Sequence, residues 1–169
     1  MAAQGVDVLS IAAVDHKIRY ESKNRQLLKW LHLQKEPLLQ MEESAAEYLG
    51  KEEDWLRRFI QQPDIAGNSA GLSLALSGLI NEGRLENRLP IAVTGAINEH
   101  GEVSYVGLIK EKIRIAEKAG FSCLIIPSEN AEEAAAIQKE SSRKIEIIDA
   151  SHVDEAVKAI GRLNEGELD

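Results

Sequence analysis

Cysteine is almost absent from this sequence, which has Cys123 as its single thiol among 169 residues. One cysteine excludes an internal disulfide and a cysteine-based metal site. Because Cys123 lies in the apolar run 121–126, we expect it in the core. The four histidines show neither metal-ligand spacing nor a Ser-His-Asp pattern. We therefore expect no metal and no other cofactor.

Basic residues are also few relative to acidic ones, with 20 basic and 28 acidic side chains and a net charge of −8. This balance argues against binding to a nucleic-acid backbone as the main task. No apolar run reaches the roughly 18 residues of a membrane span, and no signal-peptide pattern is present. The Gly-x-x-x-x-Gly-Lys-Ser/Thr phosphate loop is missing too, which excludes ATP hydrolysis of the P-loop kind by this chain. We expect a cytoplasmic location.

The length is that of one domain with a substantial core. We expect residues 36–163 to form the main domain and residues 164–169 an acidic tail. Residues 1–35 are expected to form a strand pair and a helix, either within the same unit or as a remnant of a preceding region. No internal repeat or low-complexity segment interrupts this organisation.

Strands and helices alternate along the chain, as shown by the spacing of apolar residues. This alternation predicts an α/β fold, or an α+β fold with a mixed sheet. Residues 55–60 fit either a short helix or a strand, and the last helix has Asp149 or Ser151 as its expected N-cap. The expected strands are 6–14, 18–21, 89–97, 103–106, 122–126 and 145–148, and the expected helices are 24–34, 37–49, 69–82, 108–119, 129–139 and 153–163.

The predicted helix at residues 69–82 has no polar face before Asn81, which places it in the middle of the domain. The turn-forming residues Gly67 and Asn68 precede it, and Ser69 stands at its start. A serine in this position can cap the helix by accepting a hydrogen bond from a backbone N–H group. Alternatively it is a nucleophile, beside N–H groups and a helix dipole that stabilise an oxyanion.

The predicted helix at residues 108–119 is amphipathic, with one exception. Lys112 falls near the centre of the apolar arc and is the only charged residue there. Burial lowers the pKa of a lysine, so Lys112 could be neutral near pH 7 and act as a general base. The alternative is that its stem covers the core while its ammonium group reaches water. An adjacent base is what a serine needs to become a nucleophile, and Ser–Lys is one known pair.

Several short motifs occur in a fixed order, in residues 67–71 (GNSAG), 94–97 (TGAI), 107–112 (GLIKEK), 126–127 (IP) and 129–130 (EN). This series resembles the successive motifs of the Lon-type peptidase domain and covers roughly residues 38–160. The interval from Ser69 to Lys112 matches the spacing in that family without a gap. The resemblance implies the fold shared by Lon peptidase domains and domain 2 of ribosomal protein S5.

The resemblance also implies a function, namely a serine endopeptidase that hydrolyses polypeptides with a Ser69–Lys112 dyad and has no intrinsic ATPase. Thr94 matches a threonine whose hydroxyl could orient the lysine amine, although β-propensity alone also explains a threonine there. Backbone N–H groups around Gly67, Asn68 and Ala70 would receive the oxyanion. A homo-oligomer, in the six-membered ring common in the family, would be the assembly.

Three features depart from the family pattern. Asn68 replaces a proline, Ala96 replaces a glutamate, and the segment before Ser69 is shorter than in ATP-dependent Lon proteases. These departures keep a second function open, that of a catalytically silent domain with this fold that serves assembly or as a scaffold. A phosphate-binding kinase of the same fold superfamily is a third possibility, which the missing glycine- and serine-rich phosphate loop disfavours.

Overall fold

The computed structural model describes residues 35–51, 54–61, 68–140 and 145–166. The elements expected between residues 6 and 34 lie outside these ranges. The described helices are α3 (Lys35–Leu49), α4 (Asp54–Ile60), α5 (Gly71–Asn81), α6 (Ile109–Ala119), α7 (Ala131–Glu140) and α8 (Val153–Glu165), with the short 3-10 helix η1 (Ser128–Asn130). The described strands are β1 (Ile91–Val93), β2 (Ala96–Ile97), β3 (Val103–Ser104), β4 (Cys123–Pro127) and β5 (Glu146–Ala150).

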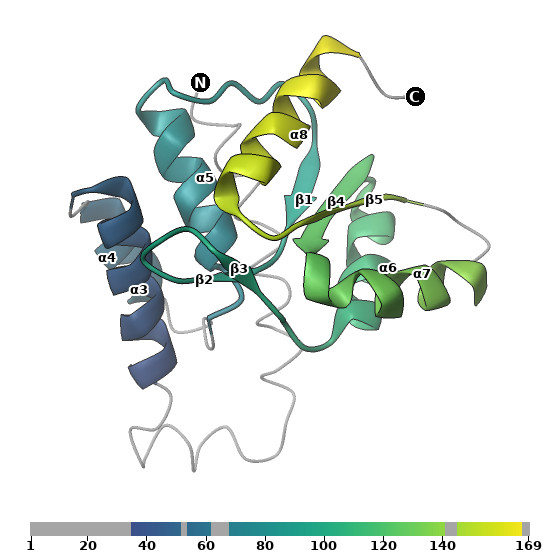
Figure 1. Ribbon diagram of the computed structural model, residues 1–169, viewed down its shortest axis with the longest axis horizontal. Helices are drawn as coiled ribbons and strands as arrows, with labels where there is room; N and C mark the ends of the chain where they lie inside the picture. Colours follow the sequence, from purple (N-terminus) through teal and green to yellow (C-terminus); the bar gives the residue numbers. More distant parts are fainter. Residues whose placement is uncertain (1–34, 52–53, 62–67, 141–144, 167–169) are drawn as a thin grey trace.

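A parallel sheet of three strands in the order β1-β4-β5 forms the middle of the described structure (Figure 1). Ile91 pairs with Cys123, and Cys123 pairs in turn with Glu146. The connection from β1 to β4 contains α6, and the connection from β4 to β5 contains α7. Helical crossovers are what parallel neighbours require, so the predicted α/β class is confirmed.

Helices cover both faces of the sheet (Figure 1). One hydrophobic cluster joins the inward sides of α3, α5 and α8 to Ile91, Val93, Cys123 and Ile125. A second cluster joins α6 and α7 to the alternate strand residues Ala92, Leu124 and Ile126. Successive strand residues point to opposite faces. Strands buried on both sides need apolar residues at every position, which explains why β1 and β4 carry no charge.

The expected strand 89–97 is in fact two strands separated by Thr94 and Gly95. β1 ends at Val93, and β2 pairs with β3 as an antiparallel hairpin in which Ala96 lies opposite Ser104. The turn between β2 and β3 is the predicted one at residues 98–101. Asn98 Oδ1 accepts hydrogen bonds from the N–H groups of His100 and Glu102, each at 3.0 Å.

Three further predictions are settled by the structure. Residues 54–60 form a helix, and α5 is buried all round from Gly71 to Leu79, as its lack of a polar face predicted. The predicted cap of the last helix was wrong, because His152 is the N-cap and its ring accepts from the Asp154 N–H group at 3.1 Å. Ser151 N instead donates to the Glu155 side chain at 2.7 Å. α8 continues to Glu165, two residues beyond its expected end.

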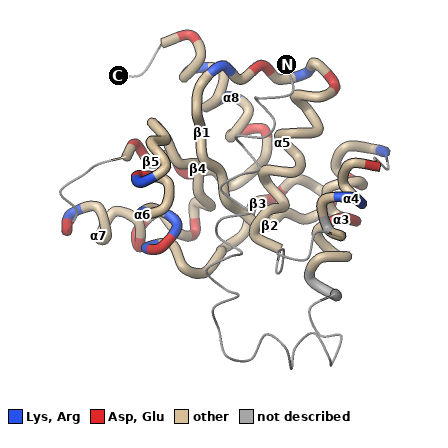
Figure 2. Tube along the Cα trace, turned by 180° about the vertical axis from the view of Figure 1, so that it is seen from behind, with Lys and Arg blue, Asp and Glu red and all other residues tan. Residues whose placement is uncertain are grey.

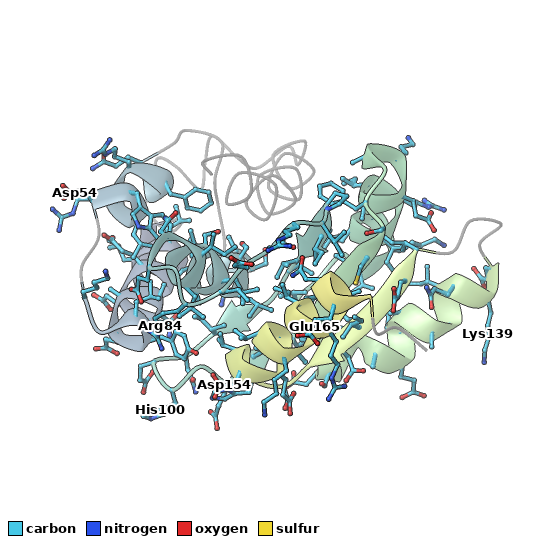
Figure 3. The ribbon with its side chains drawn as sticks, turned by 90° about the horizontal axis from the view of Figure 1, so that it is seen from above. Asp54, Arg84, His100, Lys139, Asp154 and Glu165 are labelled. Atoms are coloured by element: carbon cyan, nitrogen blue, oxygen red, sulfur yellow. The ribbon has the colours of Figure 1, made fainter. Side chains whose placement is uncertain are left out.

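Charged side chains lie on the helices, on the turns and on the edge strand β5, while β1 and β4 carry none (Figure 2). Seen from above, Asp54 and Lys139 project from opposite ends of the structure (Figure 3). Cys123 is a free, buried cysteine, as expected. In the described part of the chain, no helix is both long and apolar enough to cross a membrane.

We expect alanine substitutions at two helical glycines, Gly78 and Gly161, to change the stability of the protein in opposite directions. A Cβ atom on Gly78 of α5 would come within 2.8 Å of Leu49 Cδ2 on α3, and closer still to Cδ1, whereas a Cβ atom on Gly161 of α8 would meet nothing within 4 Å. We expect Gly78→Ala to lower the free energy of unfolding by about 1–2 kcal/mol, because overpacking against the buried Leu49 side chain outweighs the gain in helix propensity. Gly161→Ala should raise it by about 0.5–1 kcal/mol through helix propensity. Urea unfolding of both variants measures the contrast, and equal effects would contradict the close packing of α3 on α5.

Candidate active site

Ser69 lies in the turn immediately before α5 and is fully buried, with 0% of its surface exposed. The turn is closed by a hydrogen bond from Gly71 N to Asn68 O at 3.1 Å. Ser73, in the first turn of the helix, donates its hydroxyl hydrogen to Ala70 O at 2.8 Å. The predicted helix therefore begins two residues later than expected, and Ser69 belongs to the turn that leads into it.

Gly95 holds this turn against the sheet through two reciprocal hydrogen bonds. Gly95 N donates to Ser69 O at 2.9 Å, and Leu72 N donates to Gly95 O at 2.9 Å. Both backbone groups of Gly95 are thus turned toward α5, which explains why the expected long strand breaks here. No side chain fits at this contact, because a Cβ atom on Gly95 would lie 2.9 Å from Val103 Cγ1 and 3.2 Å from Leu72 Cβ.

The structure does not support the capping role for Ser69. The N-cap of α5 is Ala70, which makes no side-chain capping bond. The first two amides of the helix donate to backbone carbonyl groups, those of Asn68 and Gly95. The serine hydroxyl therefore has no capping task at these amides.

Lys112 lies on the inner side of α6 with only 1% of its surface exposed, and it is the largest fully buried side chain in the described ranges. Among the described residues classed as buried, it is also the only charged one. Lys110, two positions earlier, is exposed. The alternative in which the Lys112 ammonium group reaches water is therefore wrong. Lysine is rarely buried without a specific reason.

Thr94 connects β1 to the serine turn. Its N–H group continues the sheet ladder by donating to Ile125 O at 3.0 Å. Its hydroxyl, which is fully buried, donates to Ser69 O at 3.4 Å. Thr94 therefore does more than satisfy β-propensity, because its side chain contacts the residue that the sequence singled out.

The residues predicted to surround the oxyanion fall into three different situations. Gly67 lies outside the described residues. Asn68 is exposed, and Ala70 is buried. The structure thus brings Ser69, Ala70 and Thr94 together around Gly95. Lys112 belongs to α6, which packs on the other face of the sheet and shares a hydrophobic cluster with Ala96.

The start of α6 has an unusual backbone that the sequence did not reveal. Leu108, the N-cap, has φ 62° and ψ 34°, and it is the only non-glycine residue with positive φ in the described ranges. Its carbonyl accepts the first helical hydrogen bond from Lys112 N at 3.0 Å. Left-handed geometry is costly for a residue with a Cβ atom, and strain of this kind clusters at functional sites.

Two further residues near this point were missed as site residues, although both belong to a motif quoted for the family resemblance. Glu129 Oε2 accepts a hydrogen bond from Tyr105 N at 3.0 Å, and the buried amide of Asn130 makes two bonds with the backbone of Val106. Only their place in the Glu-Asn motif signals a role. Sequence periodicity does not distinguish them from an ordinary helix start.

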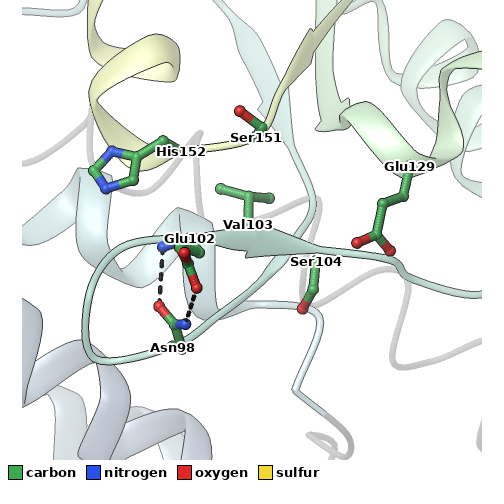
Figure 4. Close-up of a pocket in the computed structure, with 7 residues that line it drawn as sticks. All are labelled: Asn98, Glu102, Val103, Ser104, Glu129, Ser151 and His152. Atoms are coloured by element: carbon green, nitrogen blue, oxygen red, sulfur yellow. Dashed lines mark hydrogen bonds between the residues drawn. The ribbon is translucent and has the colours of Figure 1, made fainter.

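A separate pocket of about 450 Å³ lies between the β2–β3 hairpin and the start of α8 (Figure 4). It is lined by Asn98, Glu102, Val103, Ser104, Glu129, Ser151 and His152, so none of the predicted catalytic residues belongs to it. Within the ranges that the structure describes, no cluster of three or more His, Cys, Asp or Glu side chains could hold a metal ion.

Cys123 does not provide a second nucleophile. Burial, with a smaller contribution from the nearby Glu146 carboxylate, raises the pKa of the Cys123 thiol to about 12. The thiolate is the reactive form of cysteine, and it is scarce at neutral pH when the pKa is this high. Ser69 and Lys112 are both buried, and serine with lysine is one of the known variants of the catalytic triad.

Comparison with known proteins identifies the family. The model of the Lon protease (S16) C-terminal proteolytic domain matches residues 62–161. The chain is 36% identical over 92 residues to the Lon protease of Syntrophomonas wolfei, an alignment that covers 54% of this chain. It is 32% identical over 121 residues to the Lon protease of Xanthomonas oryzae, which covers 68% of this chain.

These alignments span 11% and 14% of the two relatives' own lengths. The match to the domain model, by contrast, runs over more than half of the present chain and includes both Ser69 and Lys112. The chain therefore belongs to the family of Lon protease C-terminal proteolytic domains.

The contact at Gly95 predicts a large effect of a small substitution. Gly95→Ala should force the serine turn away from the hairpin, and we expect it to lower the free energy of unfolding by about 1–3 kcal/mol. Gly107→Ala is the matched control, because a Cβ atom on Gly107 would meet nothing within 4 Å. Thermal unfolding of both variants measures the difference. If Gly95→Ala unfolded at the wild-type temperature, the reciprocal bonds would not be holding the turn.

Proposed function

We propose that this chain is a serine endopeptidase domain in which Ser69 is the nucleophile and Lys112 is the general base. The proposal rests above all on the burial of Lys112, which removes from water the one side chain whose neutral form can take the serine proton. Family membership and the contact of Thr94 with Ser69 support it. Polypeptides would be the substrates, and this chain's own chemistry would need no nucleotide.

In the proposed mechanism, the neutral Lys112 Nζ accepts the proton of Ser69 Oγ as that oxygen attacks the carbonyl carbon of the peptide bond. Backbone N–H groups at Asn68 and Ala70 are the proposed donors to the oxyanion, with Gly67 on the preceding side. The Lys112 ammonium group then gives its proton to the leaving amine. Water attacks the acyl-enzyme as Lys112 takes a proton from it, and Lys112 then returns that proton to Ser69 Oγ as the bond to the acyl carbon breaks, which releases the acid and restores the neutral lysine.

Thr94 would serve as a supporting residue in this scheme. Its hydroxyl donates toward the Ser69 carbonyl, and a hydroxyl that donates one hydrogen bond still has lone pairs with which to accept another. We propose that it accepts from the Lys112 amine and so orients it. Assembly into a homo-oligomer, possible by resemblance to the family, is not required by any step of the mechanism.

A catalytically silent assembly or scaffold domain is the second candidate, and one observation favours it. Ser69 and Lys112 are both buried, so a substrate reaches the serine only after part of the protein moves. A silent domain would need no such movement. The two candidates differ in whether the protein cleaves an unfolded polypeptide, which is directly measurable.

Cleavage of casein by four variants tests the proposal. We expect Ser69→Ala and Lys112→Ala each to reduce kcat/KM by roughly 10³-fold or more, because the two side chains act as one unit. Ser77→Ala and Lys110→Ala are the matched controls, a buried serine further along α5 and an exposed lysine on α6. Both should cleave at close to the wild-type rate.

Either of two results would count against the dyad. Cleavage that survives Ser69→Ala and Lys112→Ala would place the chemistry elsewhere. A wild-type protein that cleaves neither casein nor short unstructured peptides would favour the silent domain.

The burial of Lys112 also predicts an effect on stability. Lys112→Met replaces a buried amine by an apolar side chain of similar length, so we expect the free energy of unfolding at pH 7 to rise by about 1–2 kcal/mol. Urea unfolding measures it, with Lys110→Met at an exposed position as the control.

The pH dependence of this gain follows from proton linkage. In the proposed state, burial lowers the pKa of Lys112 in the folded protein, so the unfolded chain binds more protons than the folded one between the two pKa values. Wild-type stability then rises with pH in that window, and the advantage of Lys112→Met shrinks. An advantage that grows with pH, or a loss of stability at pH 7, would contradict the proposed state of the lysine.

A further inference from the structure

The segment that leads from β3 into α6 is held by two consecutive residues that follow β4. Glu129 Oε2 accepts from Tyr105 N at 3.0 Å. The Asn130 side chain then pairs with both backbone groups of Val106, since its Oδ1 accepts from Val106 N and its Nδ2 donates to Val106 O, each at 3.0 Å. Asn130 is fully buried. The side-chain amide of Asn130 thus satisfies both backbone groups of Val106, as a neighbouring strand would in a sheet.

The strained residue Leu108 lies two positions after this contact. Positive φ costs a residue with a Cβ atom about 1–2 kcal/mol, and the side chain of Leu108 is 40% exposed, so its own burial offsets little of that cost. Its carbonyl accepts the first hydrogen bond of α6 from Lys112 N. The position of the first helical turn, and with it that of Lys112, therefore depends on what holds residues 105–107.

We propose that Glu129 and Asn130 form a positioning clamp that fixes the start of α6 and thereby places the Lys112 amine for its work on Ser69. This inference rests on the proposed function. The clamp directly follows β4, which is buried along its whole length, so it ties residues 105–106 to the end of a central strand. Neither residue touches the reacting atoms in the proposed mechanism.

The chain offers a matched control for the clamp. Asn87, which is also fully buried, makes the same two-bond pairing with Leu89, through Nδ2 to Leu89 O at 3.0 Å and from Leu89 N to Oδ1 at 3.1 Å. Leu89 precedes β1, at the opposite end of that strand from Thr94. Removing the Asn87 amide therefore removes equivalent hydrogen bonds without touching the start of α6.

The first experiment compares Asn130→Ala with Asn87→Ala well below both unfolding temperatures. Both should unfold at a lower temperature than the wild type. Only Asn130→Ala should lower kcat, by about tenfold or more with KM within about twofold, because misplacing a catalytic group affects the chemical step. The acidic limb of its pH–rate profile should move to higher pH, since a loosened helix start admits water to the lysine.

Carboxylates near the clamp need their own control. Three carboxylates lie near the clamp: Glu129 itself, which is exposed, Glu133, whose Oε2 accepts from Asn130 Nδ2 at 3.3 Å, and Glu111 on α6. The cluster that α6 shares with the sheet is apolar and adds no charge. Glu129→Ala should shift the profile in the same direction as Asn130→Ala but less. Glu129→Gln keeps an oxygen that can accept from Tyr105 N, so it should restore the wild-type profile. Glu133→Gln tests the remaining charge and should change little.

A readout that needs no activity separates this inference from the proposed function. Lysine labelled with ¹³C at Cε, with Lys112→Met to assign the signal, reports the titration of Lys112 by NMR. We expect Lys112 to titrate at higher pH in Asn130→Ala than in the wild type, and at the wild-type pH in Asn87→Ala.

These measurements distinguish failure of the clamp from failure of the proposed peptidase function. If the wild type cleaves no peptide but Lys112 titrates at higher pH in Asn130→Ala than in the wild type, the clamp is supported and the peptidase is rejected. Cleavage with unchanged titration and unchanged kcat in Asn130→Ala would overturn the clamp and leave the peptidase intact. If Asn130→Ala did not fold, the test would rest on the exposed position, with Glu129→Ala compared with Glu129→Gln. Identical pH–rate profiles for these two variants would reject the clamp.

Discussion

The burial of one lysine among apolar side chains is the constraint on which the proposed chemistry depends. An amine in water near pH 7 holds its proton and cannot act as a base, whereas a dehydrated amine releases it more readily. α6 provides that environment because Ile109, Ile113 and Ala116 surround Lys112 on the same buried side. Such burial costs stability, which proteins generally accept only where a function requires it.

The second requirement of the proposed site is the close approach of the serine turn to the backbone of Gly95. The serine turn is attached to the sheet by Gly95, whose amide and carbonyl groups both bond to residues around the start of α5. A residue with a side chain would separate these segments, so the glycine allows the chain to leave β1 and contact α5 before forming the hairpin. Thr94 uses the same approach to bring its hydroxyl to the Ser69 backbone.

Much of this could be predicted from residue patterns. The helix without a polar face identified α5, and the helical wheel selected Lys112 over Lys110, because both inferences depend on periodicity, which burial imposes directly. The break at Thr94, the left-handed Leu108 and the pairing of Asn130 with Val106 could not be predicted in this way. The break at Thr94 and the pairing of Asn130 depend on hydrogen bonds between segments far apart in the sequence, which override local strand or helix propensity, and periodicity carries no signal for a single left-handed residue such as Leu108. His152 displaced the expected serine or aspartate cap for a similar reason, since its ring also lies 2.9 Å from His100 O in the hairpin turn.

The two hydrophobic clusters divide the proposed catalytic pair between them. The serine turn leads into α5, which packs in the cluster on one face of the sheet, and the lysine belongs to α6, which packs in the cluster on the other. Neither helical layer alone contains both Ser69 and Lys112. The separation of the proposed hydroxyl and amine is therefore fixed by the way in which two helical layers pack on opposite faces of one sheet, and not by either layer alone.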